Sequence, residues 1–411
     1  MKSIPSAAEV PLHAARLWRA AAAVLAALPL AMTIANRSAP LVLSIAAALA
    51  LLALAIEGEW QELRRRTAEA LASSLGFTLI ALALYAAMSV LWSPRPAVSL
   101  QALGEFALPL AATFVLAILL PGRAPRFAFA ALAAALALAA LLIMVELGTG
   151  LAARRSLGLR FRADVFNRSA LTLLILLPPV IWGCRDKRWL ASGAAALAMA
   201  AVLQSYSEAA ALGLALGGAA FAVALLRPRL AVILAALGIT AALALAPVMG
   251  DVLERAIPPA LHERLAAAHS QARIDIWRSF GAVVERQPWF GAGFGPGTTF
   301  LETPGAAGID PAYRHYLVAG HPHNAALQIW TELGAVGVML TGLALLLALR
   351  LLSGRTAEDL APRLAVMASA GAVSLVGHSP WQGWWPAVIG AAIVWFRIAD
   401  AQRRPSERST P

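Results

Sequence analysis

Three histidines crowd into nine consecutive positions late in the chain, at His315, His321 and His323. Such a group raises two kinds of chemistry, metal binding and acid–base catalysis. His321 and His323 are two residues apart, which would put them on different faces of a helix. No cysteine or carboxylate beside them completes a ligand set, so the pattern predicts no metal site and no cofactor.

His323 is the stronger candidate for chemistry because it stands directly before a probable membrane helix. His323-Asn324 precedes a long apolar run, which predicts that His323 lies at the N-terminus of that helix, near the outer surface. The positive end of a helix dipole disfavours an imidazolium ion. A neutral histidine at this place can act as a general base.

Arginines form a second group of candidate functional residues. Five arginines fall within fifteen residues: Arg154, Arg155, Arg160, Arg162 and Arg168. Guanidinium groups bind phosphate oxygens through paired hydrogen bonds. Two ligands fit this cluster, the headgroups of anionic lipids and a phosphate-bearing substrate, and the residues alone leave both open.

A helix should position a sixth arginine, Arg273. Apolar residues recur there at helical spacing: Ile276, Trp277, Phe280, Val283 and Val284. The stripe predicts an amphipathic helix over 273–286 that lies along the membrane surface or over the helical bundle. Arg273, four residues before Trp277, falls on the apolar side, so its side chain should point toward the protein.

Alternating glycines come after this helix, from Gly291 to Gly297. A dinucleotide-binding loop would need a preceding strand and a βαβ unit, and the sequence predicts neither. A tight, closely packed turn, with glycine supplying unusual backbone angles, is favoured instead.

The composition predicts the setting of all these residues. Apolar residues make up 60% of the 411 residues and charged residues only 13%, against about 45–50% and about 25% in soluble domains. The excess apolar surface points to lipid. The net charge of +11 then marks cytoplasmic loops and anionic membrane lipids rather than nucleic acid.

We therefore predict an all-α integral membrane protein of about 12 transmembrane helices. Nine spans fill residues 1–249, a periplasmic loop containing the amphipathic helix fills 250–322, three spans fill 323–399, and a tail occupies 400–411. The expected spans are 14–34, 39–56, 73–92, 99–120, 125–147, 166–184, 188–206, 208–226, 229–249, 323–349, 360–378 and 383–399. Segments that would then be cytoplasmic, counted together with the adjoining ends of the spans, hold 20 of the 33 Lys and Arg residues. This bias predicts that both termini are cytoplasmic and that the histidines face the periplasm of a bacterial inner membrane.

The order of these features resembles the O-antigen ligase and polymerase superfamily of bacterial membrane glycosyltransferases. His323-Asn324 followed by Glu332-Leu333-Gly334 and Gly337 is similar to the family's His-Asn motif at the entry of a membrane helix. Arg273 and Trp277 with the glycine turn, Leu91-Trp92-Ser93-Pro94, and Asn167-Arg168 also fit the family pattern. Their order along most of the chain carries the resemblance more than any one motif.

The resemblance implies a GT-C-like bundle and a function. The donor would be a glycan on a polyprenyl pyrophosphate, and the acceptor a sugar hydroxyl of lipid A–core or of another glycan. Transfer would be metal-independent and would invert the anomeric carbon. His323 and Arg273 would be catalytic. Substrate would be bound by Arg160, Arg162, Asn167, Arg168, His321 and Asn324.

One departure and two alternatives remain from the sequence. Many members carry Ser-x-Ser-Arg where this chain has Ser205-Tyr206-Ser207-Glu208, so an acid replaces an expected arginine. Among the transferase functions, ligase is favoured over polymerase and over protein O-glycosylation, although the sequence does not identify the acceptor. A transporter for lipid-linked glycans should show charged residues within spans or broken helices, and the spans look nearly free of charge.

His378 is a secondary site candidate, and Trp381, Trp384 and Trp385 are expected to be interfacial belt residues.

Overall fold

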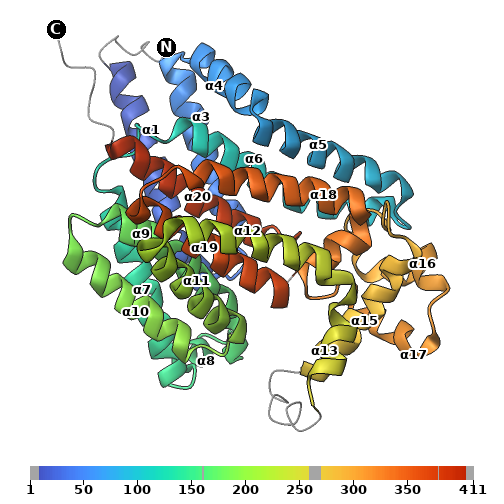
Figure 1. Cartoon of the computed structure of the whole chain (residues 1–411). Helices are drawn as coiled ribbons and strands as arrows, with labels where there is room; N and C mark the ends of the chain where they lie inside the picture. The colour runs from blue at the N-terminus through green and yellow to red at the C-terminus, as the bar shows by residue number, and fades with distance from the viewer. Residues whose placement is uncertain (1–8, 160–161, 259–269, 378, 404–411) are drawn as a thin grey trace.

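The computed structural model describes the whole chain except residues 1–8, 160–161, 259–269, 378 and 404–411. Every secondary-structure element within the described ranges is a helix. In Figure 1 the short helices that come after α12 gather at one end of a long helical bundle, and the described ends of α1 and α20 lie toward the opposite end.

The first half of the chain forms α1 to α12. Their bounds are α1 Glu9–Ala26, α2 Leu28–Ile34, α3 Ala39–Glu57, α4 Trp60–Ala72, α5 Ser74–Ser89, η1 Val90–Trp92, α6 Pro96–Leu119, α7 Ala128–Gly148, α8 Ala152–Ser156, η2 Ala163–Phe166, α9 Asn167–Gly183, α10 Arg188–Gln204, α11 Glu208–Leu226 and α12 Pro228–Leu245. Two features were not predicted. The expected first span breaks at Ala27 with a 49° bend, and α4 is an amphipathic helix without a buried residue.

The second half contains the short helices and three long ones. Their bounds are η3 Ala246–Val248, α13 Met249–Ala256, α15 Ser270–Arg286, η5 Gly297–Glu302, α16 Pro304–Ala307, α17 Pro311–Arg314, η6 His315–Ala319, α18 Ala325–Ser353, α19 Ala357–Val376 and α20 Trp384–Arg403. The amphipathic helix predicted over 273–286 is confirmed as α15, whose Trp277, Phe280 and Val284 are buried.

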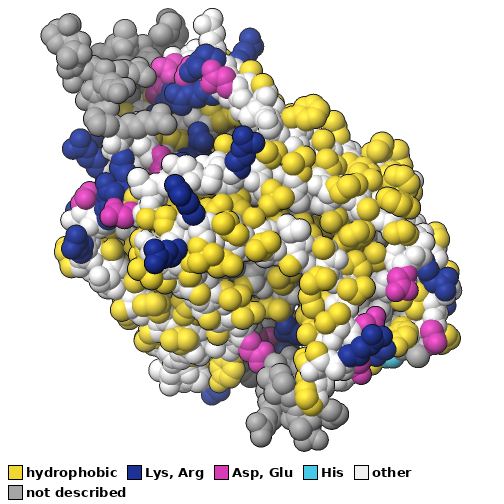
Figure 2. All heavy atoms as spheres, viewed as in Figure 1, with side chains coloured by type: hydrophobic (Ala, Val, Ile, Leu, Met, Phe, Trp, Pro, Cys, Tyr) yellow, Lys and Arg dark blue, Asp and Glu magenta, His cyan; other side chains and the backbone are white. Residues whose placement is uncertain are grey.

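Nine helices of the described chain are long and apolar enough to cross a membrane, and the bent pair α1 and α2 would make a tenth. The two expected spans that do not qualify are α10, with 17 residues, and α20, whose last turns carry Arg397, Asp400 and Arg403. On the face shown in Figure 2, hydrophobic side chains cover the middle of the molecule, and charged side chains gather toward its ends. This is the pattern of a multi-pass membrane protein.

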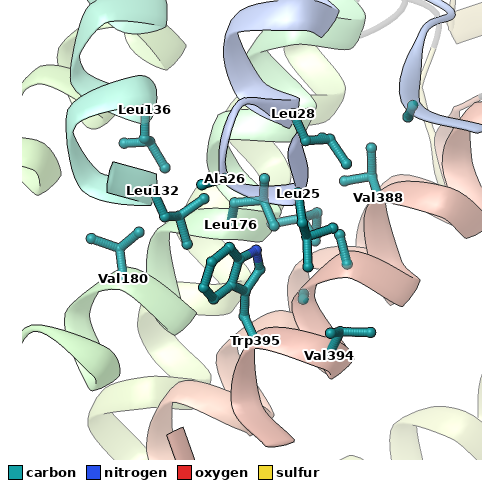
Figure 3. Close-up of a cluster of buried hydrophobic side chains, with 14 of the residues drawn as sticks. Leu25, Ala26, Leu28, Leu132, Leu136, Leu176, Val180, Val388, Val394 and Trp395 are labelled. Carbon is teal, nitrogen blue, oxygen red and sulfur yellow. The ribbon is translucent and has the colours of Figure 1, made fainter. Parts of the chain in front are cut away.

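The bundle is held together by a core of small and branched apolar side chains. Figure 3 shows part of it, where Trp395 of α20 lies among Leu25, Leu132 and Leu176 from α1, α7 and α9. The Trp395 side chain is fully buried, and its ring lies 5.1 Å from the ring of Phe129. Because small Ala residues line these helices, their backbones approach closely, as membrane helices do.

The longest helix, α18, is broken at Gly334, where the backbone has φ 62° and ψ −164°. The glycine turn fills the break. The N–H groups of Ala292 and Gly293 donate to the carbonyls of Thr331 and Glu332 at 2.8 and 2.9 Å, and Ala335 N–H donates to Pro288 O at 2.7 Å. The carbonyls and N–H that the broken helix would leave unpaired are thereby satisfied by protein.

A side chain cannot replace Gly334 without strain. A Cβ there would lie 2.4 Å from the carbonyl carbon of Trp289, and only glycine readily adopts this backbone conformation, at a cost of about 1–3 kcal/mol for other residues. We expect Gly334→Ala to lower the melting temperature of the detergent-purified protein by several degrees. Gly218→Ala, at a helical glycine with open space around it, should leave the melting temperature unchanged or higher. Equal melting temperatures would contradict this account of the break.

Candidate functional site

His323 lies in the short connection between η6 and α18. Its backbone has a φ of 53°, one of only two positive values for non-glycine residues in the described chain. The His323 N–H donates to Nδ1 of His321 at 3.3 Å, and the two rings are 4.1 Å apart. Asn324 caps α18, since its Oδ1 accepts from the N–H of Leu327 at 3.1 Å. The local chain therefore turns sharply at the histidine and is fixed by the cap directly behind it.

Arg273 lies beside His323, as its position on the apolar side of α15 predicts. Its Nη1 donates to the carbonyl of Val376 at 2.9 Å. The imidazole of His323 hydrogen bonds to the backbone of the next residue, Gly377, and the Arg273 charge acts on it. Trp277, one turn along α15, donates from Nε1 to Pro322 O at 2.9 Å. The end of α19 thus joins the arginine to the histidine.

Burial lowers the pKa of His323 below its ordinary value, the hydrogen bond to Gly377 opposes this shift, and the charge of Arg273 adds to it. The expectation of a neutral imidazole therefore agrees with the structure, but the main cause differs. Loss of solvation, rather than the dipole of α18, is the largest influence on the pKa. Near neutral pH the ring holds a free lone pair that can accept a proton.

A second cluster surrounds Arg168 at the start of α9. Its Nη2 donates to Oε1 of Gln382 at 3.2 Å, and its guanidinium lies 5.3 Å from the centre of the Trp384 ring. The buried Oδ1 of Asn167 has no hydrogen-bond partner among the described residues. Arg162 instead pairs with Asp164 at 3.1 Å and is largely exposed. Arg160 lies outside the described residues.

The connection between α19 and α20 links the two clusters, a role the sequence did not indicate. Gly377 contacts His323 at one end, and Gln382 binds Arg168 at the other. The expectation that its tryptophans form an interfacial belt is wrong for Trp384 and Trp385, which are buried. His378, the secondary candidate, lies outside the described residues.

Glu332 is the residue that sequence reasoning undervalued. It is buried within α18, and three groups donate hydrogen bonds to its carboxylate, from Gln328, Gly295 and Trp381. The spans are therefore not free of charge, since Arg363 of α19 is buried as well. The only signal for Glu332 was its place in the motif, because its partners Gly295 and Trp381 lie 37 and 49 positions away.

Glu208, the acid at the position of an expected arginine, occupies the first turn of α11. The preceding Ser207 caps the helix by accepting from the N–H of Ala210 at 3.2 Å. Glu208 itself is exposed. An acidic residue suits a helix N-terminus, so the helix start is stabilised without an arginine there.

The region from α10 into α18 carries the decisive similarity. Residues 193–342 match the family model described as O-antigen ligase. This match supports placing the chain in the O-antigen ligase superfamily. The matched region contains Arg273, His323, Glu332 and Gly334, whereas Arg168 and the α19–α20 connection lie outside it. No curated protein matches the chain. The match agrees with the resemblance seen in the motifs and indicates a membrane enzyme of the O-antigen ligase and polymerase type.

Proposed function

We propose that the protein is an O-antigen ligase, which transfers a glycan from a polyprenyl pyrophosphate donor to a sugar hydroxyl of lipid A–core at the periplasmic face of the inner membrane. One observation carries the proposal beyond the family. A half-buried histidine with a lowered pKa and an arginine meet at the Val376–Gly377 turn, which supplies a base beside a cation that can receive phosphate.

The reaction follows from these two groups. His323 takes the proton of the acceptor hydroxyl, and the resulting oxygen attacks the anomeric carbon from the side opposite the pyrophosphate. The bond from that carbon to the pyrophosphate oxygen breaks, so the configuration inverts. Arg273 and Arg168 stabilise the negative charge that develops on the leaving pyrophosphate, as fixed cations do without reorganisation.

The remaining predicted residues are assigned to substrate binding or to support of the groups that perform it. Asn167 offers an unpartnered acceptor beside Arg168, which suits a sugar hydroxyl. His321 packs against the base, and Asn324 holds the start of α18 through its cap. Arg160 and Arg162 are proposed to contribute positive charge that attracts the anionic donor.

A pH dependence follows from the environment of His323. Because burial lowers its pKa, the base stays neutral below the pH at which an ordinary histidine is protonated. We expect transfer to keep its rate as the pH falls to about 6.5, and to decline only below that as the imidazole gains its proton. The measurement is the initial rate of transfer against pH with purified protein. A decline already complete at pH 7 would contradict a neutral buried base.

A transporter is less well supported, although α18 has the broken helix and the buried charge that such a protein would show. The break at Gly334 is occupied by the backbone of the glycine turn, and the carboxylate of Glu332 is occupied by three donors. Neither feature is directed toward a path for substrate.

A deletion strain tests the proposed function and separates ligase from polymerase. We expect polymer on lipid A–core to disappear while free lipid-linked polymer of normal length remains. Polymer that stays attached but becomes short would instead indicate a polymerase. Lipid-linked glycan retained on the cytoplasmic face would indicate a transporter. Complementation with the wild-type chain is the control.

A further inference from the structure

The carboxylate of Glu332 is held in the interior of the bundle, with 1% of the residue exposed. Its Oε1 accepts from Nε2 of Gln328 at 2.6 Å. Its Oε2 accepts at 2.6 Å from both the N–H of Gly295 and the indole N–H of Trp381. Among the residues that the structure describes, no cation pairs with it. A buried carboxylate without a cation is costly, so its retention calls for a reason other than packing.

All three partners are donors, and only a carboxylate, which accepts without donating, satisfies them together. The Glu332 carboxylate fixes the orientation of the Gln328 side-chain amide. Nε2 of that amide is shared between Glu332 and Oγ of Ser379, which it reaches at 3.0 Å, while its own Oε1 is buried without a partner. The amide is turned so that its oxygen stays unpaired, because the carboxylate requires the N–H side.

The contacts continue from Glu332 to both halves of the site. Ser379, bound by Gln328, is two residues from Gly377, which holds the imidazole of His323. Trp381, bound by Glu332, directly precedes Gln382, which holds Arg168. Rings of Phe294 and Phe106 pack on Trp381 at 4.5 and 5.1 Å, so the indole has little freedom. A change at Glu332 therefore acts on one connection that touches both clusters.

We propose that Glu332 is a positioning residue for the transfer reaction: its carboxylate orients Gln328 and Trp381, which hold Gly377 against His323 and Gln382 against Arg168. The inference rests on the proposed function for its kinetic consequence. The structural part, that Glu332 fixes the surroundings of His323, stands independently of which glycan is transferred.

Glu332→Gln is the first variant. An amide at position 332 can accept from Gly295 and Trp381 with its oxygen, and its nitrogen then faces Gln328. The Gln328 side chain should turn so that its Oε1 accepts from that nitrogen, which removes the N–H donor to Ser379 and leaves the buried Nε2 of Gln328 without an acceptor. We expect turnover to fall about 10- to 100-fold, as displacements near 1 Å cause in enzymes, with the donor KM changed less than about threefold.

The exchange variant Gln328→Glu/Glu332→Gln is the sharper test. The carboxylate would then lie at position 328, where it can accept from the amide at 332 and from the hydroxyl of Ser379. Every donor again has an acceptor, and the connection to the α19–α20 segment is restored. We expect turnover at least about tenfold above that of Glu332→Gln. A residue that serves only packing would give two losses that add, without this recovery.

A second readout does not depend on turnover. The rate at which diethyl pyrocarbonate modifies His323, located by peptide fragmentation, should rise several-fold in Glu332→Gln and return toward wild type in the exchange variant. Glu146→Gln is the matched control. Glu146 is also buried and accepts from the backbone N–H of Ala153 and Arg154, and its loss should leave the His323 rate unchanged.

The outcomes separate the two proposals. Wild-type turnover and wild-type His323 reactivity in Glu332→Gln, or an exchange variant no better than the single one, would overturn the positioning role. If the wild-type protein transfers no glycan, the proposed function fails. The His323 rates in the single, exchange and Glu146→Gln variants would still decide whether Glu332 holds the site.

Discussion

Replacing His323 is expected to abolish glycan transfer while the protein still inserts and folds in the membrane. A positioned general base contributes about 10²- to 10⁴-fold to a rate, and the imidazole of His323 is bonded to Gly377 within the influence of the Arg273 charge. Two variants are needed, because the backbone at this position has a positive φ of 53°. His323→Ala removes the base and strains the turn. His323→Asn also removes the base but tolerates left-handed backbone more readily.

The measurement is the initial rate of transfer by purified protein at a fixed saturating donor concentration, beside the melting temperature in detergent. His315→Ala is the matched control, since His315 is exposed in the same group of short helices and contacts Tyr316 rather than the base. It should keep nearly full activity. Near-normal transfer by His323→Asn would remove the histidine from the mechanism, whereas loss of transfer in His315→Ala would show that the short helices tolerate little change.

Features encoded locally were predictable from the sequence. The stripe from Ile276 to Val284 fixed a helix face at 3.6-residue spacing, and the face placed Arg273 toward the protein. The glycines after it could support only a turn with positive φ angles, four of which are found. In each case the deciding interactions lie within a few residues of one another, where patterning is informative.

The break in α18 was not predictable in the same way. An apolar run that contains Gly334 looks like a continuous span, because hydropathy does not report that the glycine turn about forty residues earlier enters the helix. The buried charges share this cause. Glu332 is kept by donors from Gly295 and Trp381, which only the folded chain brings together. Hydropathy also predicted a span at α20. This helix is not among the nine of the described chain that are long and apolar enough to cross a membrane, and its charged end pairs Asp400 with Arg363.

The link between Arg273 and the cluster around Arg168 also depends on contacts between residues far apart in the sequence. The sequence named both Arg273 and the cluster around Arg168 as site residues, but it gave no element to join them. The structure supplies that element in the α19–α20 connection, which has no strong motif of its own. Arg162, by contrast, was grouped with Arg168 by proximity in sequence alone, and its nearest partner is Asp164.

Replacing Arg273 with alanine is expected to lower transfer about 10²- to 10³-fold, the usual cost of removing one donor to charge that develops in a transition state. Arg273→Lys should recover only part of this loss. A lysine keeps the charge but cannot offer the planar pair of donors that binds phosphate oxygens in a bidentate manner, and it has fewer N–H groups to spare after one reaches Val376.

Arg278→Ala is the matched control on the same helix. Arg278 pairs with Asp251 at 3.0 Å and lies against Tyr313, so its loss should cost stability but little transfer. A further readout separates a chemical role from a structural one. Because the Arg273 charge lowers the pKa of His323, Arg273→Ala should raise that pKa and move the acidic decline of activity to higher pH, while Arg273→Lys should leave it near its wild-type position. Full activity in Arg273→Ala, or a low rate with an unchanged pH profile, would contradict the catalytic role. Arg273 would then have only a structural role, as the hydrogen bond that joins α15 to the end of α19.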